Sequence, residues 1–129
     1  MKASNTTRKK NKLEKEANEL WKQLALKKWG YVCVACGEPA DCFHHFVLKS
    51  RSVLLRFNVD NAIPICRKCH YNIHHSYDPL VRYDTIDAIK TAKGKKWCEW
   101  IEEMRPKQLG GTYGIHYLEN LIEELKKQL

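Results

Sequence analysis

The segment HHFVLKSRSVLLRFNVDNAIPICRKCHYNIH, residues 44–74, decides the fold of this chain because it combines metal-binding residue types with two short strand patterns and a helix pattern. Residues 43–48 and 62–65 are predicted to form two short strands. Residues 67–75 follow the second strand and form the predicted helix. We therefore expect an α+β fold whose centre is a small ββα unit around a metal ion.

Two C-x-x-C pairs, one before this segment and one within it, predict a zinc site. The pairs are Cys33–Cys36 and Cys66–Cys69, with 29 residues between them. Thiolate pairs at this spacing can close a tetrahedral zinc site, whereas the alternative is four unrelated buried thiols. The sequence shows no signal-peptide pattern, so we expect zinc in a reducing compartment rather than disulfides of a secreted protein. The two remaining cysteines, expected to be packed thiols, are Cys42 and Cys98.

The histidines of the segment indicate a second metal site. His70 and His74 are four residues apart and share one face of the predicted helix. His44 and His45 are neighbours in the predicted strand, so their side chains point to opposite sides. Only one of them can face a metal held by His70 and His74. Phosphodiester hydrolysis requires this division, because one group must bind a cation and a separate imidazole must accept a proton from water.

A purely structural reading of the histidines is the alternative. In that case the second site would be another zinc site, with either Cys42 or His75 as the fourth ligand. This alternative assigns no role to His45 or Asn61. His75 is also the rival of His74 in the catalytic interpretation, although it lies five residues beyond His70.

The segment resembles the HNH (His-Asn-His, ββα-metal) endonucleases over residues 31–76, with H-H, D-N and C-x-x-C-H-x-x-x-H elements in order. The resemblance implies that His45 is the general base and that Asn61 holds the loop carrying this base through hydrogen bonds to the backbone. It implies a catalytic divalent ion, Mg²⁺ or Mn²⁺ or another transition ion, with ligands His44, His70 and His74. The family's variant with a structural Zn²⁺ matches Cys33, Cys36, Cys66 and Cys69.

The flanks resemble, more loosely, the NinG (Rap) recombination endonucleases of tailed phages. The shared features are the stretch LWKQLALKK at residues 20–28 and a tail with Trp-rich and Leu-rich helices. This likeness implies action on branched recombination intermediates such as Holliday junctions and forks. Where many HNH proteins have Asp before the base, this chain has His44, which leaves the preferred ion open.

The length of 129 residues predicts one domain with flanking helices. We expect a disordered basic arm over 1–10 and an N-terminal helix over 11–30, opened by a capping box of Asn11 and Glu14. The core is expected over 31–78, with a loop at 49–58. A C-terminal helical extension follows over 79–129, helical over 85–93, around Trp97 to Met104, and along a final apolar stripe of Ile115, Leu118, Leu121, Ile122, Leu125 and Leu129.

The net charge of +8 indicates a partner rich in phosphate. Residues 1–30 carry nine Lys/Arg against three Glu, which gives +6 of this excess. A solvated helix face is the alternative explanation. No segment is long and apolar enough to span a membrane, so we expect a cytoplasmic protein, in the host cytoplasm if phage-encoded. The basic residues expected to contact DNA near the cleft are Lys49, Arg51, Arg56, Arg67, Lys68 and Arg82.

The sequence thus predicts a metal-dependent DNA endonuclease that leaves 5′-phosphate and 3′-hydroxyl ends, as the resemblance implies. The alternatives are a nicking or packaging-associated HNH nuclease without branch specificity, and a zinc module that binds DNA without catalysis. His45 argues against the last, because a binder has no use for a metal-free imidazole beside a metal. The final apolar stripe is a possible homodimer surface, or else packs on Trp97, Trp100 and the first helix.

Overall fold

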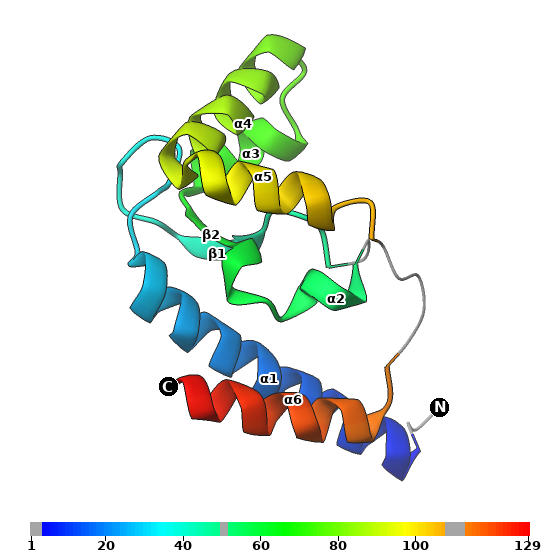
Figure 1. The fold of residues 1–129 in the computed structure, drawn as a ribbon. Helices are drawn as coiled ribbons and strands as arrows, with labels where there is room; N and C mark the ends of the chain where they lie inside the picture. The colour runs from blue at the N-terminus through cyan, green and yellow to red at the C-terminus, as the bar shows by residue number, and fades with distance from the viewer. Residues whose placement is uncertain (1–3, 50–51, 108–112) are drawn as a thin grey trace.

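The structure is a computed structural model that describes residues 4–49, 52–107 and 113–129. The sheet lies between a pair of helices, α1 and α6, and a group formed by α3, α4 and α5 (Figure 1). No helix in these described ranges is long and apolar enough to cross a membrane. The elements in chain order are α1 (Asn5–Trp29), β1 (Cys42–His45), α2 (Val53–Arg56), η1 (Val59–Asn61), β2 (Ala62–Ile65), α3 (Arg67–His74), α4 (Pro79–Lys93), α5 (Lys95–Met104) and α6 (Ile115–Gln128).

The predicted α+β class is confirmed, with a two-stranded antiparallel sheet followed by a helix at the centre. Cys42 pairs with Ile65 and His45 pairs with Ala62. The first strand is shorter than the predicted 43–48, because β1 ends at His45. After His45, the next two backbone amides both donate to Asn61. The Phe46 amide donates to the carbonyl of Asn61, and the Val47 amide donates to its side-chain oxygen.

The prediction of a disordered arm over 1–10 is wrong for the residues that the structure describes. Helix α1 begins at Asn5, and Ser4 caps it by accepting a hydrogen bond of 3.1 Å from the amide of Thr7. A serine that binds an otherwise unpaired amide in this way stabilises a helix start. The expected start at Asn11 therefore lies inside the helix. Residues 1–3 lie outside the described ranges.

The C-terminal stripe is covered by the chain's own first helix. Leu118, Ile122 and Leu125 are buried in one cluster with residues of α1, including Leu20 and Trp21. Helices α1 and α6 lie side by side and run in the same direction (Figure 1). The interpretation of this stripe as a dimer surface is therefore wrong for its buried residues. The alternative was right about the first helix, but Trp97 and Trp100 belong to a different cluster.

The remaining helices enclose the segment between the two strands. The predicted loop over 49–58 contains the short helix α2 and is followed by the 3₁₀ turn η1. Helix α4 begins six residues before the expected 85, because Asp78 caps it and Pro79 occupies its first turn. Helix α5 packs Trp97 and Ile101 against buried side chains of the inter-strand segment.

Candidate metal and catalytic site

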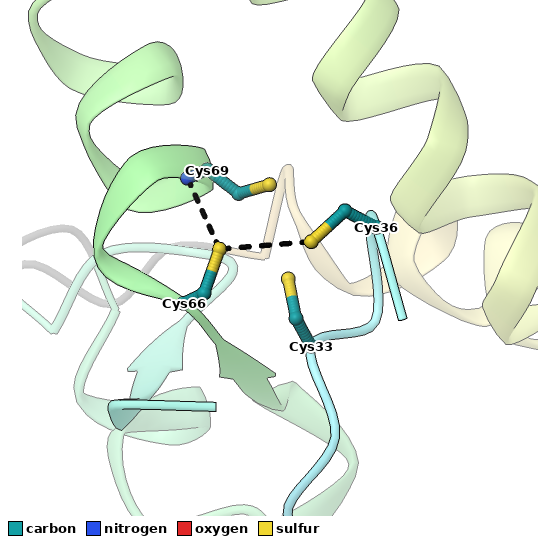
Figure 2. Close-up of side chains that lie close together, drawn as sticks. All are labelled: Cys33, Cys36, Cys66 and Cys69. Carbon is teal, nitrogen blue, oxygen red and sulfur yellow. Dashed lines mark hydrogen bonds between the residues drawn. The ribbon is translucent and has the colours of Figure 1, made fainter. Parts of the chain in front are cut away.

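Four cysteine sulfur atoms meet where the first loop contacts the start of α3 (Figure 2). Their Sγ atoms all lie within 4.8 Å of one another, and those of Cys36 and Cys66 are 3.7 Å apart. A tetrahedral zinc site with Zn–S bonds of about 2.3 Å has S–S edges of about 3.8 Å. The separation fits this edge and is far above the length of a disulfide bond, about 2.05 Å. The predicted four-cysteine cluster is confirmed, and it can hold a structural zinc ion.

The backbone around these thiols is shaped to present them. Gly37 follows Cys36 with φ of 82°, a conformation that glycine adopts without the steric cost of a Cβ. The amide of Val34 donates to the carbonyl of Pro64, which fastens this loop to β2. Burial raises the pKa of Cys33, but hydrogen bonds from the backbone of Cys66, Cys36 and Ala35 outweigh it and bring the pKa to about 7. A thiolate is thus accessible at neutral pH even before metal binds.

The second group consists of three histidines, one from β1 and two from α3. The ring centroid of His44 lies 4.6 Å from that of His70 and 4.7 Å from that of His74. The Nε2 atoms of His44 and His74 are 2.9 Å apart, a distance that fits two ligands of one ion as well as a hydrogen bond. One ring nitrogen from each of the three lies within 4.8 Å of the others. The predicted set is therefore brought together.

Neither alternative ligand joins this group among the described residues. His75 ends α3, and its ring lies beside Tyr71, with a centroid distance of 5.5 Å. Cys42 lies in β1, and its thiol is directed at the carbonyl of Ile65. A structural zinc site needs four protein ligands. The three-histidine group offers three in the described chain, as in metal sites that keep a position open for water or substrate.

Burial keeps two of these histidines, His44 and His74, in the metal-binding protonation state. Burial, together with charge repulsion from the neighbouring His70 and His74, lowers the pKa of His44 to about 3. Burial also lowers the pKa of His74. A neutral imidazole has a lone pair to donate, so His44 and His74 need not lose a proton before they bind an ion at neutral pH.

His45 points to the other side of β1, toward α1. Its ring stacks on Trp21, with centroids 4.2 Å apart and an angle of 3° between the planes. Its Nε2 lies 2.7 Å from the carbonyl oxygen of Arg56. Because a carbonyl only accepts, Nε2 carries the hydrogen and Nδ1 keeps the lone pair. Burial outweighs this hydrogen bond and, together with the charges of Lys49 and Arg56, lowers the pKa of His45 to about 4.

Asn61 is fully buried, and its side chain bonds to three backbone groups of the described residues. Its Oδ1 accepts from the amide of Val47 at 2.8 Å, and its Nδ2 donates to the carbonyls of Val47 at 2.9 Å and Leu55 at 3.2 Å. Val47 lies two residues after β1, at the start of the loop, and Leu55 lies in α2, just beyond its end. Asn61 thus ties together the two ends of the loop that leads from His45 to the Arg56 carbonyl.

The expected phosphate-binding side chains lie in different places. Lys49 and Arg56 are beside His45 and line a groove of about 250 Å³ that also contains Lys15 and Asn18 of α1. The Arg56 guanidinium already contacts Glu14, at 3.7 Å, and the Tyr113 hydroxyl. The remaining candidates are divided among α3, α4 and the chain outside the described ranges: Arg67 and Lys68 are exposed in the first turn of α3, Arg82 donates to the Ser76 carbonyl, and Arg51 lies outside those ranges.

Two parts of the His45 environment are absent from the sequence prediction. Trp21 lies on the buried face of α1, and it also stacks on the imidazole. The group that binds Nε2 is the main-chain carbonyl of Arg56, whose side chain alone was considered. A carbonyl belongs to every residue, so no sequence signal identifies it. Trp21 carries a weak signal, because a buried indole needs a hydrogen-bond acceptor and a partner for its face.

Comparisons with known proteins do not assign this site. No protein-family model matches the chain, and no curated protein or solved structure matches it. The chemistry of the site is therefore argued from its residues and their geometry. The resemblance to HNH endonucleases depends on the spacing of the motif residues alone.

Proposed function

We propose that this protein is a metal-dependent DNA endonuclease of the HNH type. The observation that carries the proposal is the division of the two adjacent histidines. His44 joins two other imidazoles in a group with three ligands, whereas His45 is kept out of that group and held in one tautomer by a backbone carbonyl. A structural metal site gives no reason for a separate, fixed imidazole at His45, whereas hydrolysis needs both the metal ligands and this imidazole.

In this proposal His45 accepts the proton of the attacking water at Nδ1. The imidazole is unprotonated at neutral pH because burial lowers its pKa to about 4. A divalent ion at His44, His70 and His74 would supply positive charge to the scissile phosphate and to the 3′ leaving oxygen. Stacking on Trp21 and the bond to Arg56 prevent the ring from turning its protonated nitrogen toward the water.

Charge and shape near His45 support DNA as the substrate. Lys49 lies on the exposed surface beside His45, and Lys15 faces the same groove from α1. Such cations bind phosphates of any sequence, so they support affinity without base preference. The preference for branched DNA is proposed from the resemblance of the flanks alone. It loses one argument, because the apolar stripe of α6 that would have formed a dimer is largely buried on α1.

The test uses zinc-loaded protein with linear, nicked, forked and four-way DNA of matched sequence, with Mg²⁺ or Mn²⁺. We expect cleavage that depends on the added ion and leaves 5′-phosphate ends, which phosphatase treatment followed by relabelling with a kinase will detect. His45→Ala is the control for contaminating nuclease. Binding without cleavage on all four substrates would favour the non-catalytic DNA-binding module. Equal cleavage of all four would keep the endonuclease and remove branch specificity.

A further inference from the structure

The segment 58–62, which contains η1 and Asn61, is held by side chains from three surrounding helices. Trp21 and Trp29 of α1 donate through Nε1 to the carbonyls of Asn58, at 2.8 Å, and Val59, at 3.0 Å. Trp97 of α5 donates to the carbonyl of Asp60 at 2.7 Å. Lys93 of α4 donates through Nζ to the carbonyl of Ala62 at 3.0 Å. We call these four donors, Trp21, Trp29, Trp97 and Lys93, the carbonyl clamp.

The clamp binds four of the five carbonyls of this segment. The remaining carbonyl of the segment, that of Asn61, accepts from the amide of Phe46 at 2.9 Å. A 3₁₀ turn leaves several carbonyls without a partner inside the turn, and such groups are costly when buried. Within the turn, the amides of Asn61 and Ala62 already donate to the carbonyls of Asn58 and Val59, where Trp21 and Trp29 supply second donors. Trp97 and Lys93 bind the carbonyls of Asp60 and Ala62, for which the turn supplies no donor. Each of these bonds also restricts where the backbone of Asn61 can lie.

The clamp members also contact one another. The Nζ of Lys93 lies 3.2 Å from the centroid of the Trp29 ring and 5.6 Å from that of Trp97. An ammonium over the face of an indole is attracted by the ring's electrons. Lys93 therefore links an indole of α1 to an indole of α5 across the segment. Burial of three tryptophans does not by itself require that all three bind carbonyls of the same short segment, because a buried indole can bind an acceptor elsewhere on the chain.

We propose that the carbonyl clamp positions the catalytic loop, and that Trp29, Trp97 and Lys93 are positioning residues that act through Asn61. The inference rests on the proposed function. The route is continuous: the clamp holds the backbone of Asn61, the Asn61 side chain holds Val47 and Leu55, and the next carbonyl, that of Arg56, holds His45. Helices α1, α4 and α5, which lie outside the ββα unit, therefore help to position the site.

The chain contains a matched control for this proposal. Trp100 lies three residues after Trp97 on the same helix and in the same apolar cluster. Its indole makes no hydrogen bond to any residue that the structure describes. Replacing either tryptophan with phenylalanine removes an indole and keeps an aromatic ring. Only Trp97→Phe removes a clamp bond, so the pair separates the hydrogen bond from packing.

The first measurement needs no activity. The Val47 amide donates to Asn61 Oδ1, so its hydrogen exchange, followed by NMR, reports whether Asn61 stays in place. We expect Trp97→Phe to accelerate this exchange about three- to tenfold relative to amides of α6, a factor that corresponds to one hydrogen bond of ordinary net strength. Trp100→Phe should leave it unchanged. Trp29→Phe, at the end of α1, is the second clamp variant in case Trp97→Phe does not fold.

The second measurement is steady-state cleavage of DNA. We expect Trp97→Phe and Trp29→Phe to lower kcat about tenfold with KM unchanged, and Trp100→Phe to lower neither. Unchanged Val47 exchange in both clamp variants, or an equal effect in Trp100→Phe, would overturn the proposal. A fall in activity that merely follows global unfolding would do the same. If the wild-type protein cleaves no DNA, the proposed function fails, whereas the exchange data still decide whether the clamp holds Asn61.

Discussion

Asn61 and Val47 exchange two hydrogen bonds, one from the Val47 amide to Asn61 Oδ1 at 2.8 Å and one from Asn61 Nδ2 to the Val47 carbonyl at 2.9 Å. The side-chain amide here takes the place of a strand partner, because it presents one acceptor and one donor to a single residue. Its second N–H reaches Leu55. No other side chain of this size offers one acceptor and two donors. This requirement makes Asn61 difficult to replace.

Asn61→Asp should therefore destabilise the protein and reduce its activity. Aspartate can still accept from Val47, but the carbonyls of Val47 and Leu55 lose their donors, and a charge is buried where Asn61 is fully enclosed. Each buried group left without a partner costs about 1–3 kcal/mol, so for two such carbonyls we expect a loss of about 2–6 kcal/mol in urea unfolding. Asn120→Asp, on the exposed surface of α6, is the control for the added charge. Equal stability of the two variants would contradict the hydrogen-bonding role.

His45→Ala should reduce cleavage by about 10²–10⁴-fold, the usual contribution of a general base. Zinc content, DNA affinity and the circular dichroism spectrum should remain close to wild type, because His45 belongs to neither ligand group. His75→Ala is the matched control, since His75 is exposed at the end of α3. A large loss in His75→Ala together with full activity in His45→Ala would show that the base is misassigned.

The pH dependence of cleavage follows from the lowered pKa of His45. A base works only when unprotonated, so its contribution is present above its pKa and is lost as the pH falls through it. In the folded protein that pKa is about 4 instead of 6.5, because burial disfavours the charged ring. The pKa of His44 is lower still, about 3, so protons should not displace an ion from it first. We expect kcat/KM, measured at saturating Mn²⁺, to stay level through pH 6.5 and to fall only near pH 4–5.

Zinc loss is the main complication at low pH, so zinc content must be measured at every point of that profile. A fall in kcat/KM centred near pH 6.5 with zinc fully retained would contradict the low pKa. It would also indicate that His45 is more open to solvent in the active protein than its stacking on Trp21 implies.

Much of the metal chemistry was predictable from sequence, because it depends on local spacing. The i, i+4 relation of His70 and His74 and the two C-x-x-C pairs place ligands correctly whatever the rest of the chain does. The alternation of His44 and His45 across a strand is equally local. The carbonyl clamp was not predictable, since its acceptors are main-chain atoms of 58–62 and its donors lie up to 37 positions away in sequence.

The errors at the chain ends have a different cause. Residues 5–10 are polar and basic, which favours disorder when the charge run is considered alone. In the structure Ser4 caps the helix, and Lys10 lies over the ring of Tyr113, with Nζ 5.1 Å from its centroid. Likewise the apolar stripe of α6 is long, but α1 buries it from within the same chain. Periodicity identifies an apolar face without naming the surface that covers it.

The two metal groups should respond differently to a chelator. Mild EDTA treatment should remove activity but leave one zinc per chain, and added Mg²⁺ or Mn²⁺ should restore cleavage. Four thiolates bind zinc far more firmly than three neutral imidazoles bind a hard cation. Atomic absorption measures the retained zinc. Cys36→Ser should lose that zinc and much of the folded structure, because zinc binding contributes directly to folding. Folded protein without zinc, or disulfides among the four cysteines, would refute the two-site interpretation.

Helix α1 should contribute to DNA affinity as a rigid cationic surface. Arg8, Lys12 and Lys15 are exposed on it, and Lys15 lines the same groove as Lys49 and Arg56. Replacing these three with glutamine keeps good helix formers in place, whereas deleting the first residues would also remove the Ser4 cap. Each phosphate contact contributes about 0.9 to the slope of log K against log salt on duplex DNA, so the slope should fall by up to about 2.7.

The control for that experiment is a triple glutamine variant with the same change in net charge, made at positions away from the groove: Lys95, Lys96 and Lys127. If charge alone attracts DNA, both variants lose affinity equally. If α1 contacts the phosphates directly, only its variant reduces the slope, and it does so on every DNA sequence alike because phosphate contacts carry no base information. An unchanged slope in the α1 variant would mean that the +6 excess of the first thirty residues is only a solvated helix face.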